Sequence, residues 1–167
     1  LWSGTIVFVA QPAEELGMGA EAMLKAGLYR RFPKPNFALA FHVAASLPAG
    51  MVGIRSGPVL ASAENVVIVV KGRGGHGAAP HLTIDPIVLS AKLVLDLQTL
   101  VSRETAPTDP AVVTVGTLHC GTKSNLIPDS CELKLTVRTY SEKVRNHLIA
   151  GITRKANAVA AGGGDVA

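Results

Sequence analysis

Two adjacent carboxylates, Glu14 and Glu15, follow an apolar run at residues 5–10 and precede a helix-like stretch at residues 17–31. The run, TIVFVA, is rich in β-branched residues, which is typical of a strand buried on both faces. Open α/β sheets bind their ligands beyond the carboxyl ends of the strands, so chemistry is expected here. One carboxylate could bind a metal ion while the other takes a proton from water. Alternatively, both acids lie where a helix dipole favours negative charge.

His42 ends a second apolar run, at residues 37–42, and the strand ends of one sheet could bring it beside Glu15. Imidazole and carboxylate ligands together suit zinc or manganese. The alternative is a structural histidine at the end of a strand. A glutamate and a histidine do not complete a catalytic zinc site, which uses three protein ligands and a water molecule. The remaining ligands are not evident in the sequence.

His76 lies in a glycine-rich stretch, residues 72–77, that matches the pattern GxGxxG after a strand. Dinucleotide binding is excluded because a helix would have to begin at the last glycine, and Pro80 and Pro86 interrupt that region. A phosphate-binding loop is excluded because no GK[ST] follows. The stretch is then either a flexible backbone that presents His76 and His81 or a glycine turn with two exposed histidines.

Asn125 and Arg138 form another candidate pair. Asn125 lies in a loop between two expected strands, and Arg138 lies on the polar face of the second strand. A guanidinium group there can bind a carboxylate through two hydrogen bonds, and an amide can donate to a developing oxyanion. The alternatives are a loop-capping asparagine and a solvated arginine.

The elements that must position these residues fall into two parts. Residues 1–60 are typical of part of an α/β sheet, and residues 61–167 form a β-α-β-β-α pattern, a split βαβ unit lacking its last strand. The strands expected in the first part are residues 5–10, 37–42 and 51–55. The elements expected in the second part are residues 65–71, 86–102, 111–119, 131–139 and 141–160. Asp85 and Ser141 can cap the two helices of this second part.

Composition excludes several classes of protein. With 167 residues, 48% of them apolar, and a net charge of +4, the chain can bury a core and is not disordered. The longest apolar runs are strand-sized and too short for a membrane span. Basic and acidic residues are interleaved, which argues against nucleic-acid binding. The low charged fraction, 17%, indicates that some of the surface meets another protein surface.

The two cysteines, Cys120 and Cys131, make neither a CxxC motif nor a disulfide framework, and the N-terminal residues do not resemble a signal peptide. A reducing, cytoplasmic setting is therefore expected. The first residue is not methionine, and the second part stops where its last strand should begin. We expect the sequence to be an internal fragment of a longer protein.

Several motifs, taken together, resemble one family along essentially the whole chain. They are QPAEE at residues 11–15, FH at 41–42, LPAG at 47–50, GGHGAAPH at 74–81, DP at 85–86, SNLIPD at 124–129 and TVRT at 136–139. This series is similar to the two-metal amidohydrolases of the aminoacylase and carboxypeptidase G type. It is most similar to the branch of hippurate hydrolase and indole-acetyl-amino-acid hydrolase.

The resemblance implies a fold: a partial zinc-peptidase-like α/β catalytic domain at residues 1–60, followed by an α+β ferredoxin-like lid and dimerisation domain at residues 61–167 that lacks its last strand. It implies a homodimer formed through the lid, with the helix at residues 86–102 and its neighbouring strand in the dimer face. It also implies two divalent metal ions, such as zinc or manganese, and a small N-acyl-amino acid substrate.

The same resemblance implies roles for individual residues. Glu14 corresponds to the general base, and Glu15 and His42 correspond to metal ligands. His76 corresponds to the lid histidine that reaches the site of the partner subunit and stabilises the tetrahedral oxyanion. Asn125 and Arg138 are implied to position the substrate and hold its free carboxylate.

The chain departs from the family pattern in three places. The family has a ligand pair before residue 1 and a histidine ligand after residue 167, so the fragment itself is expected to be inactive. Neither cysteine matches the upstream ligand. Residue 64 is glutamate where aspartate is usual. The alternatives to the amidohydrolase interpretation are a non-catalytic dimerisation or ligand-binding module, and a dipeptidase or carboxypeptidase of the same family.

Overall fold

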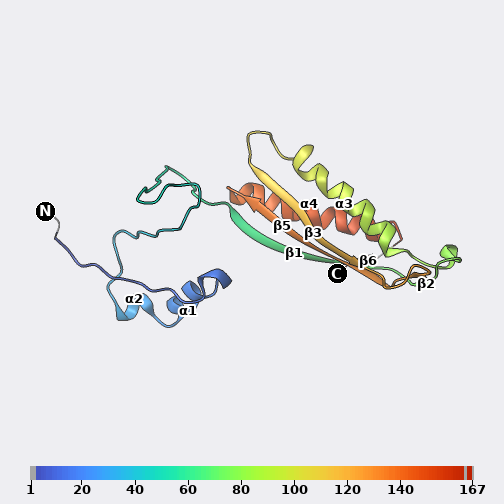
Figure 1. Cartoon of the computed structure of the whole chain (residues 1–167), viewed down its shortest axis with the longest axis horizontal. Coiled ribbons are helices and arrows are strands. Elements are labelled where there is room, and N and C mark those ends of the chain that lie inside the picture. Colours follow the sequence, from blue (N-terminus) through green and yellow to red (C-terminus); the bar gives the residue numbers. More distant parts are fainter. Residues whose placement is uncertain (1–2, 164, 167) are drawn as a thin grey trace. The chain divides into compact units, whose positions relative to one another are not determined.

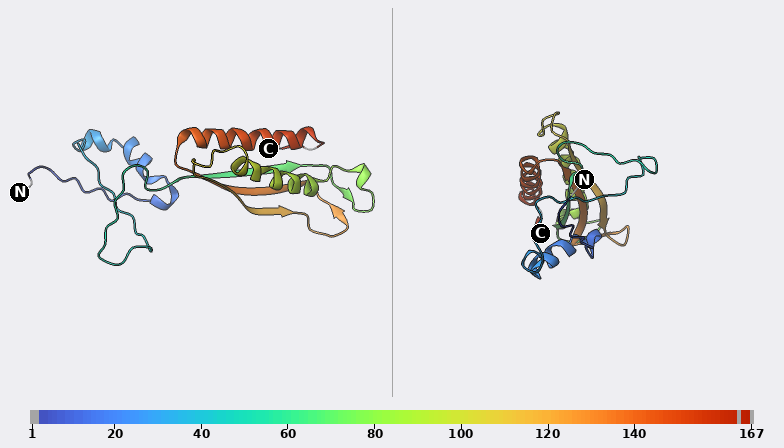
Figure 2. Two further views of the ribbon diagram at one scale, coloured as in Figure 1. Left: turned by 90° about the horizontal axis from the view of Figure 1, so that it is seen from above. Right: turned by 90° about the vertical axis from the view of Figure 1, so that its left-hand side faces the viewer.

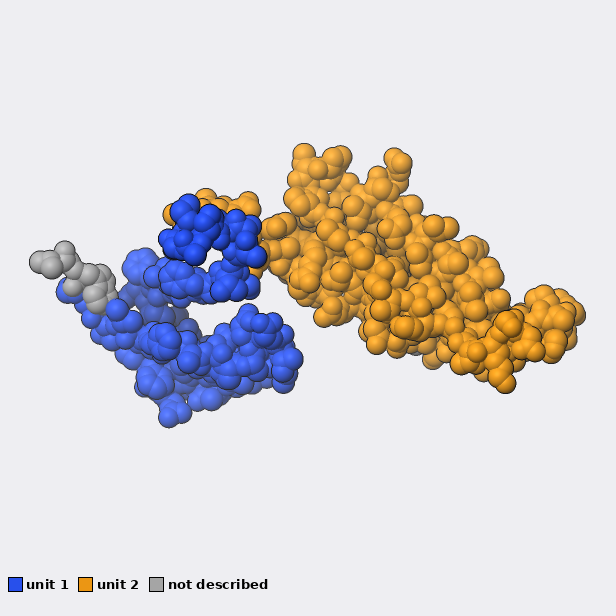
Figure 3. Space-filling view, in the orientation of Figure 1, with its two compact units in different colours: residues 1–53 blue, residues 54–167 orange. Residues whose placement is uncertain are grey.

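The computed structural model describes residues 3–163 and, for the backbone alone, residues 165–166. The chain divides into two compact units, Leu1–Gly53 and Ile54–Ala167, which are coloured separately in Figure 3. The domain boundary expected between residues 60 and 61 stays a prediction.

The first unit contains three short helical segments: the 3₁₀ helix η1 (Glu14–Leu16), α1 (Gly19–Lys25) and α2 (Leu28–Arg31) (Figure 1). The strands expected at residues 5–10, 37–42 and 51–55 are wrong, because these residues adopt no strand in the structure. Their side chains are largely exposed, with Phe8 at 90% and Phe37 at 91%. A buried strand needs hydrogen-bonding neighbours and two covering layers, and the described residues of this unit supply neither.

The second unit is an antiparallel sheet covered by two helices. Its main elements are β1 (Ser62–Lys71), α3 (Pro86–Ser102), β3 (Ala111–Cys120), β5 (Ser130–Thr139), α4 (Glu142–Ala161) and β6 (Asp165–Val166). The strand order is β3-β5-β1-β6, with all neighbours antiparallel. Figures 1 and 2 show α3 and α4 on the same face of the sheet, which leaves the other face open.

This order and direction of strands is the split βαβ arrangement, so the lid fold predicted from the sequence is confirmed. The expected strands and helices of the second part match the observed ones to within a few residues. The sequence predicts no final strand, whereas the structure has two residues, Asp165 and Val166, paired with β1 in that position.

Both long helices begin at the predicted caps. The carboxylate of Asp85 accepts a hydrogen bond from the amide of Ile87 at 2.9 Å, and Pro86 occupies the first turn of α3. The hydroxyl of Ser141 accepts from the amide of Val144 at 3.2 Å. Each cap satisfies an amide that has no partner within its helix, so the chain enters both helices at a defined residue.

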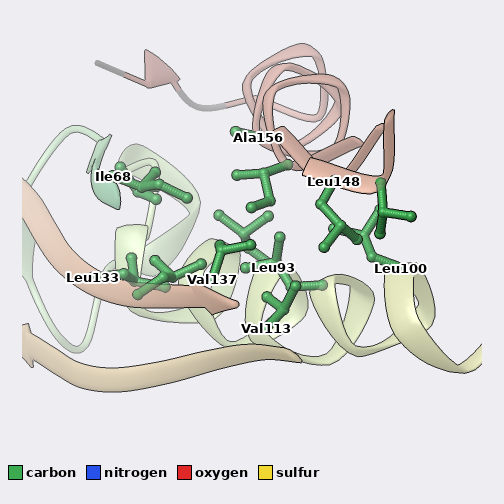
Figure 4. Packing of buried hydrophobic residues seen from close by; sticks show 13 residues of the cluster. Ile68, Leu93, Leu100, Val113, Leu133, Val137, Leu148 and Ala156 are labelled. Carbon is green, nitrogen blue, oxygen red and sulfur yellow. The ribbon is translucent and has the colours of Figure 1, made fainter. Parts of the chain in front are cut away.

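The core lies between the sheet and the two helices (Figure 4). Strand β5 alternates, with every second side chain from Cys131 to Thr139 buried against the helices and the intervening ones on the open face. Fully buried leucines project from three elements and meet in this layer: Leu93, Leu97 and Leu100 of α3, Leu133 of β5 and Leu148 of α4. The period of two along the strand therefore fixes which face of β5 the core occupies.

The two cysteines are paired, which corrects the expectation from the sequence. Cys120 of β3 lies directly opposite Cys131 of β5, with Cα atoms 4.6 Å apart, and a disulfide joins them. The cytoplasmic setting expected from the sequence stays a prediction. None of the helices among the described residues combines the length and the apolar character that a bilayer-spanning segment needs.

Reduction of the Cys120–Cys131 disulfide is expected to destabilise the chain. The two cysteines are 11 residues apart in the sequence. Opening a loop of that size raises the entropy of the unfolded chain and so lowers the free energy of unfolding by about 3 kcal/mol. Urea unfolding with and without a dithiol reductant measures the difference. A Cys120→Ser, Cys131→Ala double variant is the control, since reductant should not change its unfolding curve. Coincident curves for the wild type would contradict the pairing.

Ion pairs tie α4 to the rest of the unit. The ammonium group of Lys155, a residue that is only 8% exposed, contacts Asp96 of α3 at 2.7 Å and Glu104 at 3.0 Å. The hydrogen bond from Lys155, assisted by Arg154, holds the pKa of Glu104 below its usual value of 4.5. Arg145 of α4 pairs with Glu64 of β1 and, chiefly through this hydrogen bond, lowers the pKa of Glu64 in the same way.

These lowered pKa values predict loss of stability in acid. A carboxyl group whose pKa is lower in the folded state than in the unfolded state stabilises the fold above its unfolded pKa, and this contribution disappears as pH falls through the folded value. We expect the free energy of unfolding to decrease below about pH 4.5. In a Glu64→Gln, Glu104→Gln double variant, the decrease should be shallower, and stability at pH 7 lower. Denaturant titrations between pH 7 and pH 3 test both expectations, and parallel pH profiles for the two proteins would contradict them.

Candidate functional site

The structure brings His76 and Asn125 together at one end of the second unit. His76 lies in the short strand β2 (Gly75–His76), which pairs with β4 (Leu126–Ile127). The amide of Gly77 donates to the backbone carbonyl of Asn125 at 2.8 Å. Figure 1 shows β2 beyond one end of the main sheet, while β1 begins at the other end. We call the paired segments 72–77 and 125–129 the tip.

The imidazole of His76 has a defined hydrogen-bonding arrangement. Its Nδ1 accepts a hydrogen bond from the backbone amide of Ala78 at 3.1 Å. A ring nitrogen that accepts from an amide carries no proton, so the neutral ring carries its proton on Nε2. His76 is exposed. The structure therefore presents an N–H donor to the solvent at the tip, which is the form that an oxyanion requires.

Asn125 contributes a second polar group to the same region. Asn125 is exposed, and its side-chain amide makes no hydrogen bond to any of the described residues. The backbone of Asn125 is held by Gly77, so its position relative to His76 is fixed although its side chain is available. The tip thus carries an imidazole N–H and a carboxamide, on the two paired segments, and each group can donate to a ligand.

Arg138 does not join this pair. It lies on the open face of β5, opposite Ala63 of β1 and Val112 of β3, whereas the tip adjoins the other end of β5 at Ser130. A strand rises about 3.4 Å per residue, which puts Arg138 on the order of 25 Å from the tip end of the sheet. The guanidinium is exposed and has no ion-pair partner among the described residues.

Glu14 and Glu15 occupy η1 in the first unit, and both are exposed. This single 3₁₀ turn is framed by two left-handed residues, Ala13 at φ 48° and Gly17 at φ 65°. Ala13 is the one non-glycine residue with positive φ in the described part of the chain. Such a conformation costs a non-glycine residue on the order of 1–3 kcal/mol. The helix-dipole explanation is weakened, because one isolated turn has little dipole.

His42 has the opposite tautomer from His76. Its Nδ1 lies 2.7 Å from the carbonyl oxygen of Val43, which can only accept, so Nδ1 donates and Nε2 keeps its lone pair. Metal-binding histidines commonly donate their second ring nitrogen to a backbone carbonyl in this manner. His42 is exposed in the first unit.

The donor set of the first unit fits part of a divalent metal site. The carboxylate of Glu15 and the free Nε2 of His42 are ligands that zinc and manganese accept. Among residues 3–163, however, no three histidine, cysteine, aspartate or glutamate side chains gather closely enough to hold a metal ion. A metal site that uses Glu15 and His42 would therefore need further ligands.

Sequence reasoning missed the contacts by which Asp129 joins the two segments of the tip. Its carboxylate Oδ1 accepts from the amide of Gly74 at 2.9 Å, and its backbone carbonyl accepts from the amide of Gly72 at 2.8 Å. The residue ends the SNLIPD motif, but its partners are about 55 positions away in the sequence. A local sequence pattern does not predict contacts between residues so far apart in the chain. They follow from the pairing of β2 with β4.

The comparisons with known proteins agree with this fold. Residues 62–164 match the family model described as the M20 peptidase dimerisation domain. The chain is 43% identical over 138 residues to the N-acetyldiaminopimelate deacetylase of Bacillus subtilis, covering 83% of this chain and 37% of that protein. It is 40% identical over 148 residues to thermostable carboxypeptidase 2 of Saccharolobus solfataricus, covering 87% and 37%. The chain thus spans little more than a third of the length of these relatives.

A solved structure shows the same similarity. The crystal structure of a Bacillus subtilis protein described as a dinuclear metal binding peptidase from the M20 family matches with a TM-score of 0.66 and 32% identity, over 94% of this chain and 38% of that one. The family predicted from the motifs is confirmed. With a family match that spans most of the second unit and relatives that extend into the first, this chain belongs to the M20 peptidase family and contains its dimerisation domain.

Proposed function

We propose that the natural protein containing this sequence is a metal-dependent amidohydrolase that cleaves the amide bond of N-acyl-amino acids. The observation that carries the proposal is the tip, where an exposed His76 with its proton on Nε2 lies on the segment paired with the one that carries Asn125. Such a pair of donors suits the oxyanion that forms when a carbonyl is attacked. The similarity to a protein named as an N-acetyldiaminopimelate deacetylase supports this class of substrate.

Each candidate residue takes one role in this proposal. Glu14 takes a proton from the attacking water and passes it to the leaving amine. His76 and Asn125 donate hydrogen bonds to the oxygen of the scissile carbonyl. Arg138, exposed and without an ion-pair partner among the described residues, holds the free carboxylate of the amino acid and so fixes the position of the amide bond.

Glu15 and His42 are proposed as metal ligands. The lone pair left on Nε2 of His42 supports its part in this pair. Two divalent ions would supply polarisation of the scissile carbonyl and a lowered pKa for the attacking water. The name of the solved relative, a dinuclear metal binding peptidase, supports a pair of ions but leaves zinc and manganese as alternatives. We place the remaining ligands outside residues 1–167.

We further propose that the protein works as a homodimer. The dimerisation-domain match supports this state. Strand β3 lies at the edge of the sheet, and α3 beside it exposes Leu95 at 73% and Val88 at 55%. An exposed strand edge and neighbouring apolar side chains are features of a surface that pairs with another chain. The predicted dimer face, α3 with its neighbouring strand, is retained as the proposal.

The distance between Arg138 and the tip supports sharing of sites between subunits. An N-acyl-amino acid is far shorter than the roughly 25 Å of strand that separates them. One subunit therefore cannot present both groups to the same small substrate. In the proposal, His76 and Asn125 serve the site of the partner subunit, while Arg138 serves the site of its own subunit.

Metal analysis combined with activity assays tests the proposed function. The natural protein should bind metal ions and hydrolyse N-acetyl- and hippuryl-amino acids, with activity lost on chelation and restored by zinc or manganese. The 167-residue chain alone should be inactive, because it lacks ligands. Stoichiometric metal and turnover in the short chain would contradict the assignment of missing ligands.

A carboxypeptidase of the same family is the second candidate, favoured by the 40% identity to thermostable carboxypeptidase 2. Parallel assays with N-acetyl-amino acids and with unblocked dipeptides separate the two activities. If the full-length protein dimerises and binds metal but hydrolyses neither class of substrate, the remaining interpretation is a non-catalytic dimerisation or binding module.

A further inference from the structure

Asp129 joins the two segments of the tip. Besides the pairing of β2 with β4, three amides of segment 72–77 donate to segment 125–129: Gly72 and Gly74 donate to Asp129, and Gly77 donates to Asn125. The bond from Gly74 goes to the carboxylate oxygen Oδ1, at 2.9 Å, and is the one side-chain contact among the three. Asp129 thus holds the strand that carries His76 at two points.

The close approach of the two segments explains the glycine at residue 74. A Cβ atom there would lie 2.6 Å from the carbonyl oxygen of Ile127 and 2.9 Å from Oδ1 of Asp129. Any larger residue would push the segments apart and break the bond between Gly74 and the carboxylate. Packing therefore accounts for this glycine of the GxGxxG match, which needs no bound cofactor to explain it.

The environment of Asp129 argues against an ordinary stabilising ion pair. The residue is exposed, and among the described residues no lysine, arginine or histidine forms an ion pair with it. The hydrogen-bond partner of its carboxylate is a backbone amide two residues before His76. On the other side, the chain runs from Asp129 back through β4 to Asn125, so the carboxylate bridges the backbones that carry both donors.

We propose that Asp129 is a positioning residue that holds the backbone segment of His76 against the segment of Asn125 and so fixes where the two donors are presented. This inference rests on the proposed function of those two donors. Asp129 acts through the backbone and touches no reacting atom. A group that donates to the substrate must lie within hydrogen-bond distance of its acceptor, and a displacement of about 1 Å can lower turnover 100-fold.

Variants at residue 129 in the natural protein test the inference. Asp129→Ala removes the acceptor and should lower kcat for an N-acetyl-amino acid by about 10- to 100-fold, with KM changed much less. Asp129→Asn keeps an oxygen that can accept from Gly74 and should restore most of the activity. Asp109→Ala, which removes an exposed carboxylate from a loop remote in sequence from the tip, is the matched control and should leave kcat unchanged.

Two further measurements separate positioning from general loss of stability. In a His76→Ala, Asn125→Ala background, Asp129→Ala should cause no further loss of activity, because its effect passes through those residues. Hydrogen exchange should be about tenfold faster for the peptide covering residues 72–77 in Asp129→Ala and unchanged for α3. Asp129→Asn should exchange at the wild-type rate.

The outcomes distinguish this inference from the proposed function. Wild-type protein that hydrolyses no N-acyl-amino acid overturns the proposed function and, with it, the role of Asp129 in that reaction. Active wild-type protein whose Asp129→Ala variant keeps its kcat and its exchange rates at residues 72–77 overturns the inference alone. An equal loss of activity in the wild-type and doubly substituted backgrounds also overturns it, since that pattern indicates an effect on folding.

Discussion

Replacing Glu14 by glutamine in the natural protein is expected to abolish turnover of N-acyl-amino acids while leaving the metal content unchanged. Glutamine has nearly the shape of glutamate but cannot take a proton from water, so the loss should reach at least the 10²–10⁴-fold that general-base catalysis typically contributes. Activity on an N-acetyl-amino acid and metal analysis of the same sample measure the two effects. Thermal unfolding should coincide with that of the wild type, because Glu14 is exposed.

Glu21 provides the matched control for this variant. It is an exposed glutamate in the same unit, on α1, where its carboxylate contacts Lys25 at 2.6 Å. Exposed pairs of this kind contribute little to stability, so Glu21→Gln should retain normal activity. Near-normal activity in Glu14→Gln would remove Glu14 from the role of base. Loss of metal in that variant would instead place Glu14 among the ligands.

The second unit could be predicted from the sequence because its signals are local. The alternation of β5 and the caps at Asp85 and Ser141 are each patterns of residues only a few positions apart. The structure confirms the strand and the two helix starts that they predict. The first unit could not be predicted in this way. An apolar run such as residues 5–10 becomes a strand only beside other strands, and the described residues of this unit provide no such neighbour.

The disulfide was missed because it depends on register. Strand β3 carries an irregularity between Val115 and Thr117, and the shifted register beyond it sets Cys120 opposite Cys131. A bulge changes which residues face each other across two strands, so spacing along the chain does not give the pair. Cysteine counting alone therefore led to the wrong expectation.

The candidate residues could be chosen from the sequence by type, and their roles stay predictions; their arrangement could not be derived. Carboxylates, histidines, an asparagine and an arginine are together typical of hydrolytic sites. The proton positions on His42 and His76 depend instead on the backbone of Val43 and Ala78, which only the structure places. The link between His76 and Asn125 likewise arises from the β2–β4 pairing, which joins segments about 50 residues apart.

A mixture of two variants of very low activity is expected to regain activity if His76 works in the partner subunit. His76→Ala homodimers should keep a small but measurable residual activity, and Glu14→Gln homodimers should be inactive. In a mixed dimer, the site with intact Glu14 receives His76 from the Glu14→Gln subunit and is complete, while the other site lacks both groups. Random exchange of equal amounts gives half mixed dimers with one complete site each, so about a quarter of wild-type activity should return.

The Arg138→Ala variant is the matched control for this experiment. Because Arg138 is proposed to serve its own subunit, mixing Arg138→Ala with Glu14→Gln leaves every site without either the base or the guanidinium. That mixture should stay inactive under the conditions in which the His76→Ala mixture recovers. Subunit exchange is verified in both mixtures with differently tagged chains. If exchange is complete and His76→Ala still fails to complement, His76 acts within its own subunit. If the Arg138→Ala mixture recovers activity instead, Arg138 acts in the site of the partner subunit.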